Sequence, residues 1–261
     1  MPSVSVNGIE LFYDEQNPNN HEDTIVFLHG AGGNHISWWQ QVPRFREQYR
    51  CIAMDQRGFG RSLDSSGEGV TRFTDDLEAL LDELGIERAA LVAQSMGGRS
   101  ALGFTVRSPE RVTALVMADT WGFFDWPELQ ERAEALRAAQ GDAAGAPLTD
   151  RALGTTFQEN NPAGKFLYQQ IFDLNPPRVQ QPLTAGAPAK VEVEALAVPS
   201  LFLVGSEDAL TPPEILHAVH EIVPGSRFIE VPGCGHSVYF EQPDTFNEIV
   251  GGFLADQFGA A

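Results

Sequence analysis

Short apolar runs alternate with segments of helical periodicity along most of this chain, and few folds can accommodate that order. Residues Thr24–Leu28 and 89–93 are almost continuously apolar, which is typical of strands buried on both faces of a parallel sheet. Between them, the apolar residues of 73–84 recur at helical spacing, and Gly85 follows as a stop signal. We therefore predict an α/β fold, with a mostly parallel sheet flanked by helices on both faces.

The remaining elements fit the same pattern. Asn7-Gly8, a strong two-residue hairpin signal, separates two short strand-like runs near the N-terminus. A helix rich in small residues is expected from Gly97 to about Arg107. Further strands are predicted at residues 51–54, 112–118, 200–204 and 227–231, and a last helix after Pro243 presents Phe246, Ile249, Val250, Phe253 and Leu254 on one face.

The alternation is interrupted once, over residues 122–195. This stretch contains helical pieces, of which 128–140 is the clearest, and no strong strand pattern. We therefore expect a core formed by residues 1–121 and 196–261, and a helical cap at 122–195 that lies over one end of the sheet. A chain of 261 residues suits one large α/β domain with such an insertion.

Charge and composition narrow the range of partners. The chain has 36 acidic and 17 basic residues, and its net charge of -19 would repel nucleic acid and anionic membranes. No apolar run approaches the ~18 residues that span a bilayer, and the N-terminus lacks a signal-peptide pattern. Cys51 and Cys234 are isolated, as expected of free thiols in a reducing compartment. We expect a cytoplasmic monomer or homodimer that acts on a small-molecule substrate.

Ser95 stands between a predicted strand and a predicted helix. The turn around such a serine is so tight that the residues two before and two after it must be small, and Ala93 and Gly97 meet this demand. The hydroxyl would project beyond the strand, near a helix N-terminus that favours developing negative charge. We predict that Ser95 is a nucleophile; the alternative is an ordinary strand–helix turn.

A serine hydroxyl is a weak nucleophile that needs a base. The candidate is His236, in a Gly-rich loop at 231–237 that follows the last predicted strand. A neutral imidazole can accept the serine proton and return it to the leaving group.

The third group should orient His236 and balance its charge. Asp208 directly follows the strand at 200–204, which gives the chain order serine, acid, histidine. Glu207 is adjacent but less well directed. Asp119, at the end of the strand at 112–118, is the alternative acid, and its other interpretation is a carboxylate that caps a turn.

A second Gly-rich loop, at residues 28–33, also follows a strand directly. Such backbone can turn its N–H groups toward an anion. We expect the N–H groups of Ala31 and Met96 to form an oxyanion hole, in which one donor contributes ~3 kcal/mol to transition-state stabilisation. No Gly-Lys-Ser/Thr follows, which excludes a P-loop. His29 is expected to be structural.

Aromatic residues follow the Gly-rich loop and open the insertion. If the cap lies over Ser95, Trp38, Trp121 and Phe124 would line a substrate pocket suited to an apolar or aromatic group. The alternative is that they pack between cap and core. His217 and His220 are spaced for one helix face, but no further ligands are near, so neither a metal nor another cofactor is predicted.

Five short sequence motifs follow one another along the chain. They are Leu28-His29-Gly30, the segment 55–62, Gln94-Ser95-Met96-Gly97-Gly98, the segment 205–208, and Gly235-His236. In this respect residues 1–121 and 196–261 resemble the α/β-hydrolase fold family, whose turn after the fourth strand corresponds to 55–62. Haloalkane dehalogenases and epoxide hydrolases of this fold have aspartate at the nucleophile position, and this chain has Ser95.

The resemblance implies a serine hydrolase that cleaves a carboxylic ester or a lactone through an acyl-enzyme and without a cofactor. Other reactions use the same residues on this scaffold, because fold alone does not select the chemistry. C–C bond hydrolysis, perhydrolysis, thioester cleavage and a slow-turnover receptor role therefore stay open.

Overall fold

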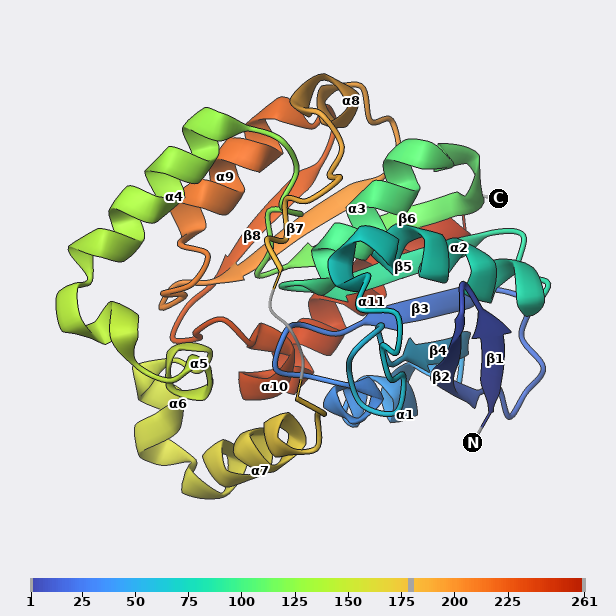
Figure 1. Cartoon of the computed structure of the whole chain (residues 1–261), viewed down its shortest axis with the longest axis horizontal. Helices are drawn as coiled ribbons and strands as arrows, with labels where there is room; N and C mark the ends of the chain where they lie inside the picture. The colour runs from blue at the N-terminus through green and yellow to red at the C-terminus, as the bar shows by residue number, and fades with distance from the viewer. Residues whose placement is uncertain (1, 178–180, 260–261) are drawn as a thin grey trace.

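The computed structural model describes residues 2–177 and 181–259 and is built around one eight-stranded sheet (Figure 1). The strand order is β1-β2-β4-β3-β5-β6-β7-β8. β1 pairs with β2 and β2 with β4 in antiparallel fashion, and every other neighbouring pair is parallel. The mostly parallel sheet flanked by helices confirms the predicted fold class.

The elements of the core follow the predicted alternation closely. The strands are β1 (Ser3–Val6), β2 (Ile9–Gln16), β3 (Thr24–Leu28), β4 (Arg50–Met54), β5 (Ala89–Gln94), β6 (Val112–Ala118), β7 (Ser200–Gly205) and β8 (Arg227–Val231). The helices that surround them are α1 (Val42–Phe45), α2 (Phe73–Glu83), α3 (Gly97–Arg107), α9 (Pro213–Ile222), α10 (Val238–Glu241) and α11 (Pro243–Phe258).

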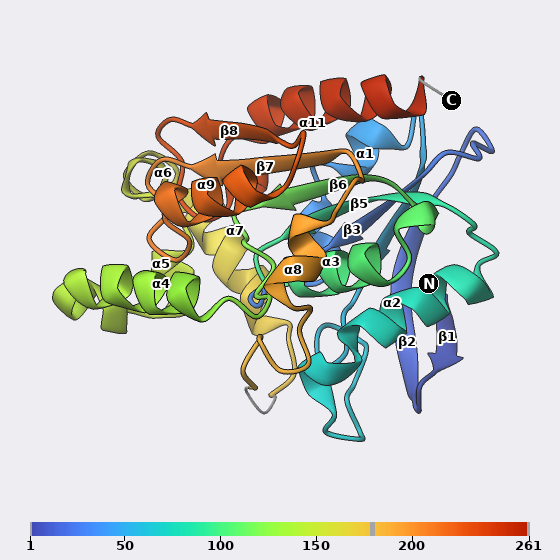
Figure 2. The same ribbon diagram turned by 90° about the horizontal axis from the view of Figure 1, so that it is seen from above.

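Helices cover both faces of the sheet, as Figure 2 shows from above. α1 and α11 lie over one face, and α2, α3 and α9 lie over the other. Every residue of β3, β5 and β7 is buried. This two-sided burial explains why these strands read as continuous apolar runs rather than as an alternation.

The turn between β1 and β2 has the predicted geometry. Asn7 has φ 45° and Gly8 has φ 79°, so both central residues lie in the left-handed region that a tight two-residue hairpin requires. Asparagine and glycine tolerate this conformation better than other residues.

A helical stretch separates β6 from β7, and we call residues 122–195 the inserted segment. It contains α4 (Pro127–Ala139), α5 (Leu148–Arg151), α6 (Thr155–Asn160), α7 (Pro162–Asp173) and α8 (Lys190–Glu194). Figure 1 shows α4 to α7 as an arc around one side of the sheet. The two ends of the segment meet at a parallel β-bridge between Asp125 and Ala189. Its role as a cap stays a prediction.

The helices of the structure were also compared with the length and apolar character of a membrane-spanning segment. Within residues 2–177 and 181–259, no helix combines the length and the apolar character needed to cross a membrane.

Candidate active site

Ser95 lies in a strained turn between β5 and α3. Its φ of 49° is in the left-handed region, which a residue with a side chain adopts only where the surroundings enforce it. The surroundings are crowded, because a Cβ atom on Gly97 would collide with the backbone carbonyl group of Leu28. The need for a small residue two positions after Ser95 therefore has a direct steric cause.

The structure brings Ser95, His236 and Asp208 together. His236 Nε2 lies 2.7 Å from Ser95 Oγ, and His236 Nδ1 lies 2.9 and 2.8 Å from the two carboxylate oxygens of Asp208. His236 and Asp208 are each only 4% exposed. With its proton on Nδ1, the imidazole donates to Asp208 and accepts from the Ser95 hydroxyl, an arrangement that can activate a serine.

Backbone groups hold the Asp208 carboxylate in this orientation. Asp208 Oδ1 also accepts hydrogen bonds from the N–H groups of Leu210 and Thr211, both at 2.8 Å. The neighbouring Glu207 points elsewhere and accepts from the Thr156 N–H at 3.2 Å and the Thr156 hydroxyl at 2.6 Å. Of the two adjacent acids, Asp208 is therefore the one that contacts His236.

Asp119, the alternative acid, occupies a different place in the site. Its carboxylate accepts from the N–H of Gly205 and the N–H of Val238, each at 3.2 Å. Burial, reinforced by the negative charge of Asp208, raises the pKa of Asp119 well above its ordinary value. Asp119 thus joins the end of β6 to the end of β7 and the start of α10.

Gln94, the residue before Ser95, was not predicted as part of the site. Its side-chain amide donates to the backbone carbonyl of His236 at 2.6 Å. The end of β5 therefore presents the serine and also holds the loop that carries the histidine. A polar side chain at the buried end of an apolar strand was the available signal for this role.

Two contacts connect the histidine loop to the inserted segment. Glu241 accepts hydrogen bonds from the N–H groups of Gly235 and Gly154, both at 3.0 Å. Burial raises the pKa of Glu241 to about 7. On the same side, Tyr168 Oη lies 3.0 Å from Ser237 Oγ. The loop beside His236 is thus held partly by residues that sequence patterns did not single out.

Ser95 and His236 open onto a cavity of about 650 Å³. Ala31 and Met96, the predicted oxyanion donors, line the same cavity. Most of the remaining wall is apolar and comes from both the core and the inserted segment, with Phe59, Leu63, Val70, Phe73, Phe123, Leu148, Leu183 and Leu210. A cavity of this size and character suits a small molecule.

The three predicted pocket aromatics lie elsewhere. Trp38 is fully buried, with its ring centroid 5.2 Å from that of Phe27 and 4.8 Å from that of Tyr239. Trp121 and Phe124 are also buried, and they contact each other at a centroid distance of 5.8 Å. The expectation that these residues line the pocket is therefore corrected.

The physical reason is that large rings bury the most apolar area by packing between layers. Phe123 is the exception at the base of the inserted segment. Its φ of 55° places it in the left-handed region, and its side chain lines the cavity, whereas Trp121 and Phe124 are buried in the core.

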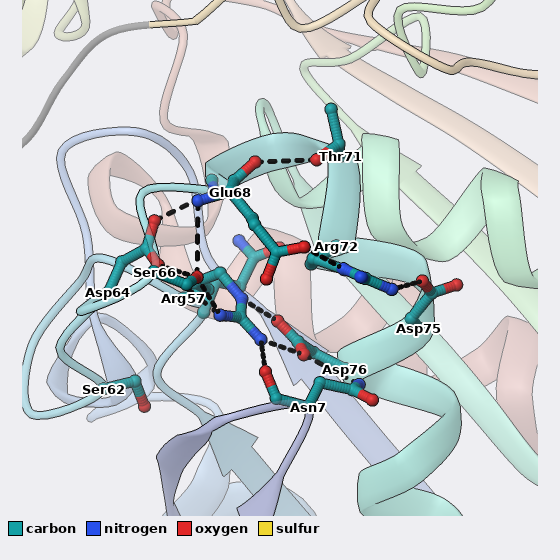
Figure 3. A network of polar contacts seen from close by, with 12 residues as sticks. Asn7, Arg57, Ser62, Asp64, Ser66, Glu68, Thr71, Arg72, Asp75 and Asp76 are labelled. Atoms are coloured by element: carbon teal, nitrogen blue, oxygen red, sulfur yellow. Dashed lines mark hydrogen bonds and ion pairs between the residues drawn. The ribbon is translucent and has the colours of Figure 1, made fainter.

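One wall of the cavity is fixed by the buried guanidinium of Arg57 (Figure 3). Arg57 forms a two-pronged ion pair with Asp76 on α2, at 2.7 and 2.8 Å. It also donates to the backbone carbonyl of Asn7 at 2.9 Å and to the hydroxyl of Ser66 at 3.0 Å. A single side chain therefore ties the first hairpin, the loop after β4 and α2 together.

Asp64 also belongs to this network, as Figure 3 shows, and it lines the same cavity. Its carboxylate accepts from the N–H groups of Gly67 and Gly69 at 3.0 and 2.9 Å, and from the Ser66 hydroxyl at 2.8 Å. Both carboxylate oxygens of Asp64 therefore accept hydrogen bonds inside the network.

Comparisons with known proteins agree with this architecture. The family model described as alpha/beta hydrolase fold matches residues 23–243. A Mycobacterium tuberculosis protein provisionally named a non-heme bromoperoxidase is 29% identical over 262 residues, covering 95% of this chain and 98% of its own. The 3-oxoadipate enol-lactonase 1 of Acinetobacter baylyi is 27% identical over 259 residues, covering 97% of this chain and 92% of its own.

A solved structure described as Est816, an N-acyl homoserine lactone degrading enzyme, superimposes with a TM-score of 0.81 at 27% identity, covering 97% of this chain and 100% of that one. The family model spans most of the present chain, and the observed sheet agrees with it. This chain belongs to the α/β-hydrolase fold family.

Proposed function

We propose that this protein is a serine hydrolase that cleaves a carboxylic ester or a lactone of a small molecule through an acyl-enzyme on Ser95. The observation that carries the proposal is the continuous hydrogen-bonded chain from Ser95 through His236 to Asp208, which opens into a cavity of about 650 Å³. A serine, a base and an orienting acid in contact are the minimum for this chemistry.

In the first half of the reaction, Ser95 Oγ attacks the substrate carbonyl while His236 Nε2 accepts the hydroxyl proton. The negative oxygen of the tetrahedral intermediate would be held by the N–H groups of Ala31 and Met96. Asp208 stabilises the imidazolium that forms. The C–O bond then breaks, and His236 gives its proton to the departing alcohol, which leaves an acyl group on Ser95.

In the second half, His236 accepts a proton from a water molecule as the water oxygen attacks the acyl carbon. The intermediate collapses, the proton passes to Ser95 Oγ, and the carboxylic acid leaves. A lactone follows the same steps, except that its alcohol remains tethered to the acyl group until water releases the ring-opened hydroxy acid.

The comparisons support ester-type chemistry without selecting one substrate. The Acinetobacter baylyi relative is named an enol-lactonase, and Est816 is described as degrading N-acyl homoserine lactones. The Mycobacterium tuberculosis relative carries a bromoperoxidase name. Lactones therefore deserve a place beside simple esters in any substrate panel.

The test is hydrolysis of short- and medium-chain 4-nitrophenyl esters by the wild type and by Ser95→Ala. We expect multiple turnover in the wild type and a loss of kcat by at least ~10³ in the variant. Hydrolysis of a panel of γ-lactones and N-acyl homoserine lactones is then measured by the release of protons. The kcat/KM values of the lactones are compared with those of the open-chain esters. Equal rates for the two proteins, or no turnover on any ester or lactone, would contradict the proposal and direct attention to carbon–carbon substrates.

A further inference from the structure

Two arginines of the inserted segment line the cavity that contains Ser95. They are Arg137, in the last turn of α4, and Arg151, at the end of α5. Arg151 Nε donates to the backbone carbonyl of Ala146 at 3.1 Å, but its Nη1 is buried and has no hydrogen-bond partner among the described residues. Arg46 Nε and Arg99 Nε are also buried without a hydrogen-bond partner among the described residues, so Arg151 differs from them in its place on the wall of the cavity beside Ser95.

The missing partner is not explained by a shortage of carboxylates, because acidic residues outnumber basic ones by 36 to 17. Arg132 lies on the same helix as Arg137 and forms an ion pair with Glu214 at 3.1 Å. Within residues 2–177 and 181–259, neither Arg137 nor Arg151 has such a partner. Arg132, which does not line the cavity, thus has a carboxylate partner, whereas the two arginines on the cavity wall have none among the described residues.

The other charged groups of the cavity wall do not compensate these arginines. Arg57 is paired with Asp76, and the Asp64 oxygens are occupied by Arg57, Ser66 and two backbone N–H groups. Burial and the positive charge of Arg137 both lower the pKa of Arg151 from its ordinary value, and an arginine still stays protonated at neutral pH. The inserted segment therefore contributes an uncompensated positive region to the cavity.

From these contacts we infer that Arg137 and Arg151 bind a carboxylate of the substrate, so that the ester or lactone cleaved at Ser95 carries a second, anionic group. This inference rests on the proposed function and names the substrate class for that site. A guanidinium presents its N–H groups in a fork that matches the two oxygens of a carboxylate. Apolar residues such as Phe59, Val70 and Phe73 would contact the carbon skeleton between the two ends. A dianionic phosphate is disfavoured, because the net charge of -19 repels it more strongly than a single negative charge.

The test uses two pairs of esters that differ only in charge. Mono-4-nitrophenyl glutarate is compared with its neutral amide analogue, 4-nitrophenyl 4-carbamoylbutanoate, which probes the acyl side. The second pair, 4-acetoxybenzoate and 4-acetoxybenzamide, probes the alcohol side. The uncatalysed rate of each ester is subtracted, and the ratio of kcat/KM for the anionic over the neutral member is the readout.

We expect the wild type to prefer the carboxylate in at least one pair, and Arg151→Gln to lower that ratio by about tenfold or more. Arg137→Gln should lower it in the same direction. Arg132→Gln, on the same helix but outside the cavity, is the matched control and should keep the wild-type ratio. The inference would be overturned if the wild type showed no preference for the carboxylate, or if Arg151→Gln and Arg137→Gln both kept the wild-type preference.

Calorimetry separates this inference from the proposed function. Monomethyl glutarate and 4-hydroxybenzoate, each with a single carboxylate, are titrated into Ser95→Ala and into the same protein carrying Arg151→Gln. One outcome is that the wild type hydrolyses no ester, while Ser95→Ala binds one of these anions and the form with Arg151→Gln binds it at least about tenfold more weakly. In that case the carboxylate site stands and the hydrolase proposal fails. If the esters are hydrolysed but neither anion binds, the carboxylate site fails and the hydrolase proposal stands.

Discussion

The cavity has two unlike walls. The core wall, residues 57–73, has its charged groups satisfied inside the protein through Arg57, Asp64 and Asp76. The wall from the inserted segment contains Arg137 and Arg151, whose charges have no carboxylate partner among the described residues. A wall whose charged groups are already hydrogen-bonded keeps its shape without a ligand. A wall with unpaired donors gains hydrogen bonds when a ligand binds. The difference suggests that the core contributes shape and chemistry and that the inserted segment contributes recognition.

The largest expected effect concerns the chemistry on the core side. Asp208→Asn should lower kcat by about 10³ to 10⁴, because an amide can no longer hold the reactive tautomer of His236 or balance its charge. Asp119→Asn is the matched control. Its carboxylate accepts hydrogen bonds from backbone N–H groups of β7 and α10 rather than from His236, so we expect a loss of less than about tenfold. Steady-state kinetics on one ester decides this, and equal losses would reassign the acid.

The second prediction concerns the ion pairs of Arg57 in the core wall. Arg57→Met removes the partner of two carboxylates, and the side chain of Asp76 is almost fully buried. We expect the free energy of unfolding to fall by about 3–5 kcal/mol, since an unpaired buried charge is left behind. Urea unfolding followed by circular dichroism measures this. Arg57→Lys keeps the positive charge but lacks the forked guanidinium, so its free energy of unfolding should lie between those of the wild type and Arg57→Met. An unchanged urea midpoint for Arg57→Met would refute the role of the network.

The third prediction concerns Glu241, which joins the histidine loop to the inserted segment. Its pKa is raised to about 7, from an ordinary value near 4.5, so ionisation is disfavoured in the folded state. The stability of the wild type should therefore fall as pH rises from about 4.5 to about 7 and level off above that. Glu241→Gln lacks this loss, and its advantage over the wild type should grow by on the order of 3 kcal/mol across the same window.

Unfolding curves of both proteins between pH 4 and pH 8 provide the measurement. A stability difference that does not change with pH would show that the Glu241 carboxyl group is not the source of the effect.

The smallest expected effect concerns the attachment of the inserted segment to the core. Arg99 on α3 is buried and donates to the backbone carbonyls of Ala185 and Gly186 at 3.2 and 2.6 Å. Arg99→Met loses these bonds but also releases a desolvated charge, so the free energy of unfolding should change by about 1 kcal/mol. We expect KM to rise more than kcat falls. A change confined to kcat would place Arg99 with the chemistry instead.

The parts of the molecule that depend on local sequence were the predictable ones. The buried strands, the helix after Ser95 and the Asn7-Gly8 turn follow from side-chain size and periodicity over a few residues. The same holds for the placement of Ser95, Asp208 and His236, since each lies shortly after the end of β5, β7 or β8, and the carboxyl ends of parallel strands lie along one edge of the sheet.

The parts that depend on how the inserted segment sits on the core could not be predicted. Trp38, Trp121 and Phe124 were expected in the pocket, but a sequence does not say which of several large rings pack inside the protein and which face a cavity. Arg151 reads as an ordinary surface arginine until its surroundings are known. Glu241 likewise gives no sign along the chain of its contact with Gly154, far away in sequence.

The β-bridge between Asp125 and Ala189 has an evolutionary consequence. It fastens the two ends of the inserted segment side by side, so the residues between them form a closed loop on a fixed base. The entropic cost of lengthening such a loop grows only logarithmically, by roughly 0.6 kcal/mol for each doubling. Insertions and deletions there transmit little strain to β6 or β7, which position Asp119 and Asp208. Changes of length away from Gly154 and Tyr168, which contact the region around His236, can therefore reshape the cavity wall while Asp119 and Asp208 keep their positions.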